Sequence, residues 1–399
     1  MHPSGCHIVI TADAPAALTK VCGISLLERW LRILQRLGFR EATIVTQTPE
    51  AIETHLAIDS WARAEITATV RPQQRAFLTP RDLTGFGNKL LLVRGDSYCD
   101  PRLLSALMAN EDTTVLADSG GGAALVTSEW IAAAHPDKPL REQMTAVRRL
   151  ELNAVSSYVA DLRREVRPIW FAAPAPEDLP RVESLLLDAA QNGTLDLPAK
   201  VHAPIETWII RRLCKTNITP NQITLSTACV SAIVTVLFAA GELTAGMILA
   251  LAVGVLDGLD GKQARVKVET TKLGQREHVL DYVLELSWWT ALAFHFTTTG
   301  QVAGAFALLL LLVGSDILDR IAKRFAKQRI RRNLDDFAPI DRFVRLIGGR
   351  RNVYVWIFAL GLATGVADKA FVALCWWGAL TAAVHVLRAG WISRQRGRP

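Results

Sequence analysis

The sequence lacks the patterns that mark exported, disulfide-bonded or zinc-binding proteins. Its six cysteines are dispersed and form no CxxC pair, so we expect buried thiols and neither a disulfide framework nor a zinc site. The stretch Met1 to Gly5 has no basic region, and the apolar run Ile8–Ile10 is far too short for a signal peptide. We therefore expect the N-terminal half to be cytosolic.

The sequence also has no basic surface of the kind that binds nucleic acid, although its formal net charge is +7. The positive residues gather in short loops between apolar runs, above all between Arg320 and Arg351. In a membrane protein, the positive-inside rule accounts for such loops. We therefore expect membrane lipid, and no nucleic acid, as a partner.

A sharp shift in composition divides the 399 residues, which are enough for two domains with cores of their own. Residues 1–200 mix strand and helix signals with scattered charges, whereas 223–390 consist of long apolar runs. We expect a cytosolic α/β domain over 1–200, an amphipathic juxtamembrane segment over 201–218, and an all-α membrane domain over 219–399.

The apolar runs predict six membrane spans, because a span needs about 20 mostly apolar residues. The spans are expected at 223–241, 244–262, 279–299, 301–319, 352–368 and 369–388. Basic loops alternate with nearly neutral ones, which predicts an integral protein of the cytoplasmic membrane with both termini in the cytoplasm. Before the first span, Pro204–Cys214 mixes Trp and Ile with paired Arg. It predicts a helix on the membrane surface, with a linker helix packed on the soluble domain as the alternative.

Acidic residues at helical spacing end the second span. Asp257, Asp260, Gly261 and Ala264 fall at i, i+3, i+4 and i+7. One face of the predicted helix would then carry two carboxylates followed by two small residues, which let a ligand or another backbone approach closely. Arg265 follows one turn beyond Gly261 and is placed to meet a phosphate oxygen.

A second acidic stripe opens the third span, where Glu277, Asp281 and Glu285 repeat at i, i+4 and i+8. A carboxylate inside a span opposes insertion by roughly 2.5–3.5 kcal/mol. Hard divalent cations would offset this cost and the mutual repulsion of the acids, so we expect Mg²⁺ or Mn²⁺. Pairing with nearby Arg and Lys is the alternative, above all for Glu285.

The segment from Asp257 to Gly274 resembles the signature of the CDP-alcohol phosphatidyltransferase superfamily, D-x2-D-G-x2-A-R-x8-G-x3-D-x3-D. The match runs through the first carboxylate pair, the glycine and the Ala-Arg dipeptide to Gly274. The segment Thr219–Thr224 (TPNQIT) before the first span is also typical of the superfamily.

This sequence departs from the signature in the third span, where strict spacing leads to His278 and Tyr282. Tyrosine is a poor ligand for hard metals. The run Glu277–Asp281 (EHVLD) resembles the D-H-G-L-D run of many members after a one-residue deletion. We assign the third and fourth acidic positions to Glu277 and Asp281, with Asp281 and Glu285 as the rival register.

The resemblance implies an enzyme that moves a phospho-alcohol from a CDP-alcohol to an acceptor hydroxyl and releases CMP. The donor would be CDP-diacylglycerol or a CDP-polar alcohol, the product of phospholipid or inositol-phosphate type, and the protein a homodimer. The implied metal ligands are Asp257, Asp260, Glu277 and Asp281, with Asp281 also as the catalytic base. The implied nucleotide-binding residues are Asn221, Thr224, Gly258, Gly261, Ala264, Arg265 and Gly274.

The N-terminal half alternates strand and helix signals. Apolar, β-rich runs occur at His7–Thr11, Ala42–Thr46, Lys89–Arg94 and Thr113–Ala117. Helical periodicity covers Ser25–Leu37 and ends at a glycine. This alternation predicts a mostly parallel sheet with helices on both faces.

Three segments of this half resemble nucleotidyltransferases, specifically the inositol-phosphate cytidylyltransferase domains that are fused to this kind of membrane module. They are Lys20–Arg29 (KVCGISLLER), the dipeptide Gly95-Asp96 after a strand, and Pro176–Leu179 (PEDL). Lys20 and Asp96 are the candidate site residues that this resemblance implies.

The parts that carry the chemistry of that family are missing. The family's Gly-rich, Arg-containing phosphate loop corresponds here to Ala12–Leu18, which has neither Gly nor Arg. The downstream acids are replaced by Ala172 and Pro174. We expect a catalytically weak or inactive domain. The alternatives are a bifunctional enzyme that makes its own CDP-alcohol from CTP, and a non-catalytic, nucleotide-sensing membrane scaffold.

Overall fold

The chain divides into two compact units. In this computed structural model, residues 5–116, 122–193, 196–269 and 274–395 are described. The N-terminal unit comprises Met1–Gly193, Arg211–Asn217 and Lys262–Thr270; the C-terminal unit comprises Thr194–Ile210, Ile218–Gly261 and Thr271–Pro399.

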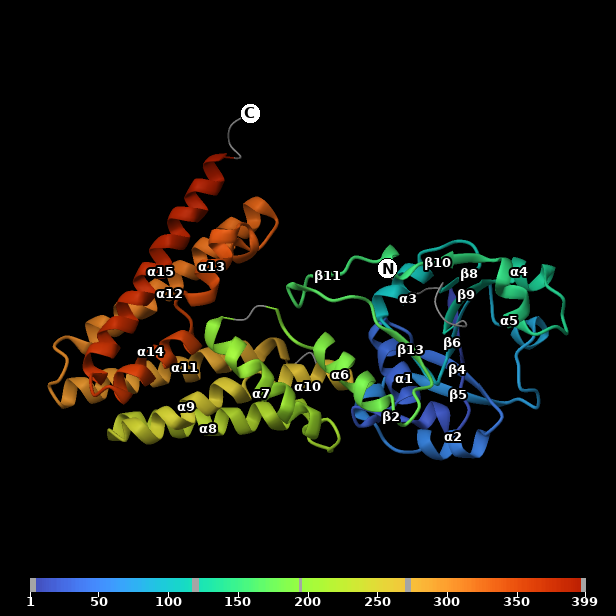
Figure 1. The fold of residues 1–399 in the computed structure, drawn as a ribbon, viewed down its shortest axis with the longest axis horizontal. Helices are drawn as coiled ribbons and strands as arrows, with labels where there is room; N and C mark the ends of the chain where they lie inside the picture. The colour runs from blue at the N-terminus through green and yellow to red at the C-terminus, as the bar shows by residue number, and fades with distance from the viewer. Residues whose placement is uncertain (1–4, 117–121, 194–195, 270–273, 396–399) are drawn as a thin grey trace. The chain divides into compact units, whose positions relative to one another are not determined.

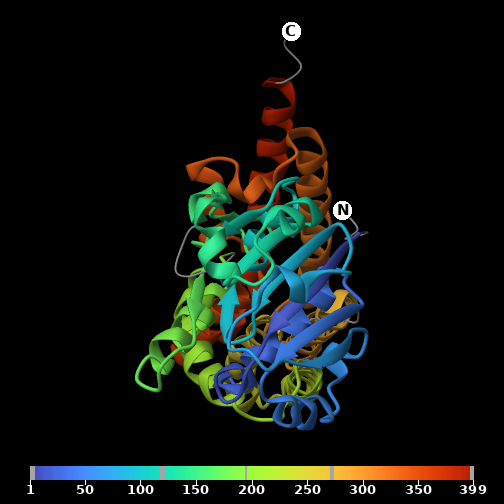
Figure 2. The ribbon, with the colours of Figure 1, turned by 90° about the vertical axis from the view of Figure 1, so that its right-hand side faces the viewer.

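The N-terminal unit is built on a seven-stranded sheet with the strand order β10-β8-β9-β6-β1-β4-β5. Its strands are β1 (Cys6–Thr11), β4 (Glu41–Thr46), β5 (Thr67–Pro72), β6 (Lys89–Arg94), β8 (Thr114–Leu116), β9 (Ala123–Thr127) and β10 (Arg148–Leu150). All neighbouring pairs are parallel except those that β9 makes with β6 and β8. Figure 2 shows these strands, coloured blue to cyan, lying side by side. The predicted mostly parallel α/β sheet is confirmed.

Alternating burial along β1 explains why helices cover both faces of this sheet. Ile8 and Ile10 belong to one apolar cluster together with Trp30 of α1 (Leu26–Arg36), whereas Val9 belongs to a second cluster with Val126. Successive side chains of a strand point to opposite faces, so each face acquires its own core. Helix α1 begins where Ser25 accepts a hydrogen bond from the Glu28 amide, an ordinary N-cap.

The C-terminal unit is entirely helical in the described residues. Its helices are α7 (Leu197–Leu213), α8 (Pro220–Ala240), α9 (Leu243–Leu256), α10 (Leu259–Lys267), α11 (Gly274–Thr298), α12 (Ala305–Ile330), α13 (Pro339–Ile347), α14 (Arg351–Ala363) and α15 (Ala367–Gln395). The last three residues of α7 and the last six of α10 belong to the N-terminal unit. Helix α8 packs against α9 and α11, and α15 packs against α12 and α14 (Figure 1).

Large aromatic side chains fill the core of this helical unit. Phe238, Trp288, Phe296, Phe358 and Phe371 are all buried in one cluster. The rings of Phe296 and Phe358 meet edge to face, with centroids 6.2 Å apart. The bundle therefore has a packed interior of its own.

Three helices among the described residues are long and apolar enough to cross a membrane, by length and composition. They are Pro220–Ala240, the α9–α10 segment Leu243–Lys267, and Ala367–Arg394. Helices occupy all six predicted spans, with α9 and the start of α10 both in the second, but the number of spans is not confirmed. Helix α14 has 13 residues, fewer than a span needs, and α11 and α12, although long enough, carry acidic residues within their apolar stretches.

Helix α7 presents opposite faces of different character. His202, Glu206 and Ile210 are buried along one face, whereas Val201, Ile205 and Trp208 are about half exposed along the other. An exposed apolar stripe on a helix is typical of segments that lie on a lipid surface.

Candidate functional site

The first turn of α8 carries the TPNQIT segment singled out in the sequence. Thr219 and Gln222 form a reciprocal capping box, and Pro220 occupies the first helical position. Asn221 and Thr224 therefore lie in the first turns of a firmly capped helix. Asn221 is exposed, and Thr224 is half-buried.

The acidic motif lies where one helix stops and the next begins. Asp257 caps the end of α9, and α10 starts at Leu259, so the predicted single helix through this motif is interrupted at Asp257–Gly258. Asp260 lies in the first turn of α10, where the helix dipole favours a negative charge. Asp257 thus follows the last turn of α9, and Asp260 lies in the first turn of α10.

Thr224 and Asp260 join the two predicted nucleotide- and metal-binding segments. The Thr224 hydroxyl donates to Asp260 Oδ2 at 2.7 Å and lies 3.2 Å from the Pro220 carbonyl. The other carboxylate oxygen of Asp260 accepts from the Gly261 amide at 2.5 Å. The structure therefore brings together residues that lie 36 positions apart in the sequence.

Asp257 pairs with a cation that the sequence did not single out. Arg351, at the start of α14, places Nη2 2.6 Å from Asp257 Oδ2. The charges of Glu285 and Asp281 also act on Arg351. Arg351 is thus the counter-charge of the acidic site. In the sequence, Arg351 stands out only as a basic residue directly before an apolar run, which the positive-inside rule already explains.

Helix α11 supplies the second acidic stripe. Asp281 and Glu285 are half-buried, and Glu285 accepts a hydrogen bond from Trp289 Nε1 at 3.4 Å. Tyr282, to which strict motif spacing leads, packs its ring under the Arg320 guanidinium, 4.6 Å from the ring centroid. Helix α11 begins at Gly274. Glu277 is a predicted metal ligand, but its side chain lies outside the described residues.

Gly258 is held against a buried carboxylate that sequence reasoning also missed. A Cβ added to Gly258 would lie 2.5 Å from Glu206 Oε1 of α7, and Glu206 is only 5% exposed. A side chain at position 258 would therefore displace Glu206. Glycine is therefore needed at position 258 for close packing against α7. The sequence pattern does not identify Glu206 as its neighbour.

The residue types of the acidic motif suit a hard divalent cation. Asp257, Asp260 and Asp281 offer carboxylate oxygens, the ligands that Mg²⁺ prefers. In the part of the chain that the structure describes, no group of three or more acidic, histidine or cysteine side chains is placed to hold a metal. The three aspartates therefore fit a divalent cation by the chemistry of their oxygens. The side chain of Glu277, the fourth predicted ligand, lies outside the described residues.

The second half of α10 belongs to the N-terminal unit. Ala264 is buried, and Arg265 Nε donates to the carbonyl of Ala190 at 2.6 Å, just after α6 (Leu179–Ala189). Arg265 also borders a cavity of about 370 Å³, together with Arg29 and Tyr98. The predicted phosphate-binding arginine is therefore anchored through one of its nitrogens.

In the N-terminal unit, hydrogen bonds tie the segment Ala12–Leu18 to its own neighbours. Asp13 Oδ1 accepts from the Gln47 amide at 2.6 Å and from the Thr46 hydroxyl at 3.0 Å. The Ala14 amide donates to Thr48 Oγ1 at 2.9 Å. The Asp13 carboxylate and the Ala14 amide are thus engaged with the end of β4 and the turn after it.

The two remaining candidates of this unit lie apart from any acidic cluster in the described residues. Arg94 forms a bidentate ion pair with Asp96, with distances of 3.0 and 2.7 Å. Lys20 is an exposed residue of the short strand β2 (Lys20–Val21). Ala172 ends β13 (Trp170–Ala172), which pairs with β7 (Ser97–Cys99).

Comparison with known families identifies the helical half. Residues 217–384 match the family model "CDP-alcohol phosphatidyltransferase", so the C-terminal half carries a domain of this family. The matched residues include Thr224, Asp257, Asp260 and Arg351. The predicted enzyme class, the CDP-alcohol phosphotransferases, is confirmed by this domain.

Similar proteins share a single name. A protein of Thermococcus kodakarensis called "Bifunctional IPC transferase and DIPP synthase" is 28% identical over 50% of this chain and 45% of its own length. A protein of Aquifex aeolicus with the same name is 24% identical over 92% of this chain and 91% of its own length. The chain is thus similar over both halves to the Aquifex aeolicus protein, and over half of its length to the Thermococcus kodakarensis protein, which is covered to less than half.

Solved structures similar to this chain cover 45% of it. They include HddC from Yersinia pseudotuberculosis, at 11% identity, 98% coverage of that protein and a TM-score of 0.34. The inositol-1-phosphate CTP transferase from T. maritima is 15% identical, with 94% of that protein covered and a TM-score of 0.30.

Proposed function

We propose that this chain is a membrane enzyme that transfers a phospho-alcohol from a CDP-alcohol to an acceptor hydroxyl and releases CMP. The observation that carries the proposal is the 2.7 Å hydrogen bond between Thr224 and Asp260. It joins the TPNQIT segment to the acidic signature within the domain that matches the family. Two matching segments in one place are better support than a motif read from sequence alone.

The reaction is a displacement at the β-phosphorus of the donor. Asp281 takes the proton of the acceptor hydroxyl, whose oxygen then forms a bond to the β-phosphorus. The bond from that phosphorus to the bridging oxygen breaks, and the oxygen leaves on CMP. A divalent cation, Mg²⁺ or Mn²⁺, held by Asp257, Asp260, Glu277 and Asp281, would supply positive charge to the diphosphate.

The nucleotide part of the donor is proposed to bind along α10 and the first turns of α8. The residues concerned are Asn221, Thr224, Gly258, Gly261, Ala264, Arg265 and Gly274. Arg351 joins them as the cation that holds Asp257 in position before the metal binds. This role is supported by the 2.6 Å ion pair between the two residues.

We further propose an integral membrane protein with both termini in the cytoplasm and a homodimeric assembly. Three apolar helices and the exposed apolar stripe of α7 support the membrane location. The domain boundaries at residues 200 and 218 belong to the same proposal. The donor is CDP-diacylglycerol or a CDP-polar alcohol.

The test is CMP release by the purified full chain with Mg²⁺, with each donor type and a hydroxyl acceptor. Asp281→Asn should lower CMP release at least 100-fold while the protein still inserts in membranes, because the base for the acceptor proton is lost. Glu285→Gln is the matched control on the same helix and should retain most activity. Absence of CMP release with every donor, or full activity of Asp281→Asn, would contradict the proposal.

A second candidate function is that the N-terminal unit makes the CDP-alcohol from CTP. The similarity to proteins named bifunctional over 92% of the chain favours it. The composition of Ala12–Leu18, which has neither Gly nor Arg, and the hydrogen bond that engages the Ala14 amide oppose it, and we propose a weak or inactive unit. Pyrophosphate release by the full chain, given CTP and an alcohol phosphate, would establish the bifunctional alternative.

A further inference from the structure

Two arginines of α1 bind the C-terminal end of the motif helix α10, within the N-terminal unit. Arg29 Nη1 donates to the Val266 carbonyl at 2.5 Å, and Arg32 Nη1 donates to the Lys267 carbonyl at 2.8 Å. Arg32 Nη1 also lies 2.8 Å from Glu269 Oε1. Arg29 is 2% exposed and Arg32 is 7% exposed. These contacts join residues about 235 positions apart in the sequence.

The end of α10 is a place where a helix needs such partners. The last carbonyls of a helix have no intrahelical donors, and they carry the negative end of the helix dipole. Guanidinium groups satisfy both requirements, since they are planar, permanently charged donors. Buried arginines in turn require acceptors, so the two sets of groups satisfy each other.

The backbone after α10 adopts a conformation that the sequence alone does not favour. The Glu269 amide donates to the Ala264 carbonyl at 2.8 Å, as in a Schellman motif. The left-handed position of that motif is usually glycine, but here it is Val268 with φ of +55°. A β-branched residue in this region is strained and persists only where its surroundings hold it.

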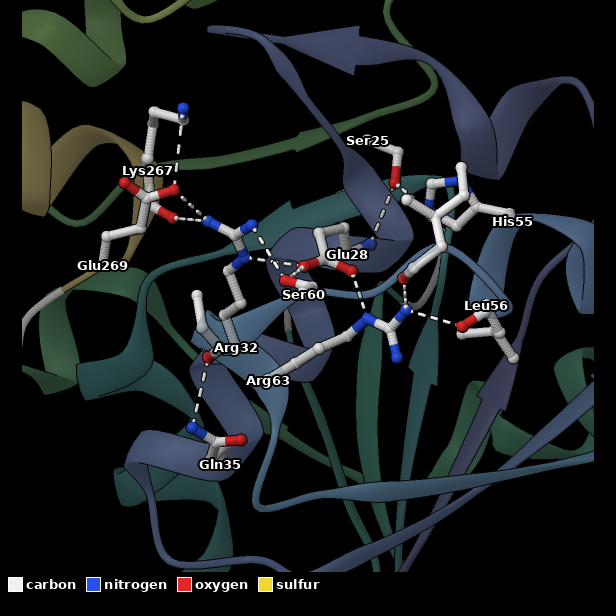
Figure 3. Close-up of polar contacts among 12 residues, drawn as sticks. Ser25, Glu28, Arg32, Gln35, His55, Leu56, Ser60, Arg63, Lys267 and Glu269 are labelled. Carbon is white, nitrogen blue, oxygen red and sulfur yellow. Dashed lines mark hydrogen bonds and ion pairs between the residues drawn. The ribbon is translucent and has the colours of Figure 1, made fainter. Parts of the chain in front are cut away.

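A buried ion network fixes the arginine that holds this turn. In Figure 3, Glu28 lies between the guanidinium groups of Arg32 and Arg63, at 2.8 and 2.7 Å, and Ser60 completes the ring. Burial alone would raise the pKa of Glu28, but hydrogen bonds from Ser60 and Arg32 outweigh it and lower the pKa. Glu28 is therefore a carboxylate at neutral pH and holds Arg32 in place.

We propose that Arg29 and Arg32 are positioning residues that fix the end of α10 and thereby hold Asp260 in the first turn of the same helix. This inference rests on the proposed function, in which Asp260 holds the divalent cation. Asp260 and Lys267 share one helix, seven residues or about 10 Å apart, so the anchored end restricts the orientation of the other. The N-terminal unit would then serve the transfer reaction without any nucleotidyl transfer of its own.

The test compares two arginines of the same network. Arg32→Gln removes the contacts with Lys267 and Glu269, whereas Arg63→Gln breaks an ion pair with Glu28 and touches no residue of α10 among the contacts of Figure 3. Both variants should lose similar thermal stability. Only Arg32→Gln should speed amide hydrogen exchange of the 259–269 peptide, by about tenfold, in metal-free protein. It should also raise the Mg²⁺ concentration for half-maximal CMP release several-fold.

Two further variants keep the outcome decisive. Arg32→Lys should restore part of the exchange protection, because an ammonium group can still reach one acceptor. Should Arg32→Gln fail to fold, Glu269→Gln removes the carboxylate partner on the other side and should also speed exchange in the 259–269 peptide. Equal exchange and equal Mg²⁺ requirement in Arg32→Gln and Arg63→Gln would overturn the inference. Wild-type protein without CMP release would contradict the proposed function, while the exchange comparison would still test the clamp.

Discussion

At the residue scale, the acidic site depends on neutral and cationic partners that keep its carboxylates in place. Asp260 is oriented by the Thr224 hydroxyl, and Asp257 is paired with Arg351. Carboxylates in apolar surroundings persist only when they are hydrogen-bonded or paired. The partners are therefore as much part of the proposed chemistry as the acids.

Thr224→Val should lower kcat/KM about tenfold. The variant loses the 2.7 Å hydrogen bond to Asp260, and a bond to a charged group contributes about 1.5 kcal/mol or more. Thr227→Val is the matched control, because Thr227 donates to the Ile223 carbonyl of its own helix. Steady-state CMP release measures both. Equal losses in the two variants would mean that the bond to Asp260 has no part in the reaction.

Arg351→Gln should make the protein more dependent on Mg²⁺ for stability. Asp257, Glu285 and Asp281 would repel one another without the guanidinium, so the metal-free melting temperature should fall. Mg²⁺ should then raise the melting temperature by more than in the wild type, since it no longer competes with Arg351. Arg350→Gln, which loses a pair with Asp335, is the control. The same Mg²⁺-induced shift in all three proteins would refute this role.

The residues with a sequence signature were predictable, and their tertiary partners were not. Thr224, Asp257 and Asp260 stand out by type and spacing, because the chemistry needs carboxylates on neighbouring turns. Arg351 and Glu206 lie far along the chain, and only the folded bundle brings them to the motif. A single sequence carries no signal for such pairs.

At the element scale, the break between α9 and α10 gives the motif its shape. A continuous helix was predicted, since the spacing of the acids suits one helix face. The structure interrupts it at Asp257–Gly258, where Glu206 of α7 packs against the glycine. Strands β1, β4, β6 and β8 lie where β-rich runs predicted them, because burial on both faces leaves a plain apolar pattern.

Gly258→Ala should destabilise the protein by about 1–3 kcal/mol, because the new Cβ would lie 2.5 Å from Glu206 Oε1. Adding Glu206→Ala should recover part of this loss, so that the double variant is less than additive. Gly314→Ala, where an added Cβ meets nothing within 4 Å, is the control on α12. Denaturation in detergent measures the stability of Gly258→Ala, Glu206→Ala, the double variant and Gly314→Ala. Strict additivity would show that the two sites do not touch.

At the scale of the whole molecule, the two units differ in how strongly their residues support an activity. The C-terminal unit keeps the family signature up to Gly274 and matches the family over 217–384. The N-terminal unit has a seven-stranded sheet, and its Ala12–Leu18 segment contains neither Gly nor Arg. A fold depends on core packing and an activity depends on its site, so the first can persist without the second.

The central claim is tested most directly by following the β-phosphorus of the donor. The full chain is incubated with Mg²⁺, a hydroxyl acceptor and a CDP-alcohol carrying ³²P at the β-position. Attack on the β-phosphorus predicts labelled phosphodiester product and unlabelled CMP in equal amounts, and neither with Asp260→Asn. Label that stays on the released alcohol phosphate, or CMP that forms without acceptor-dependent product, would contradict the account.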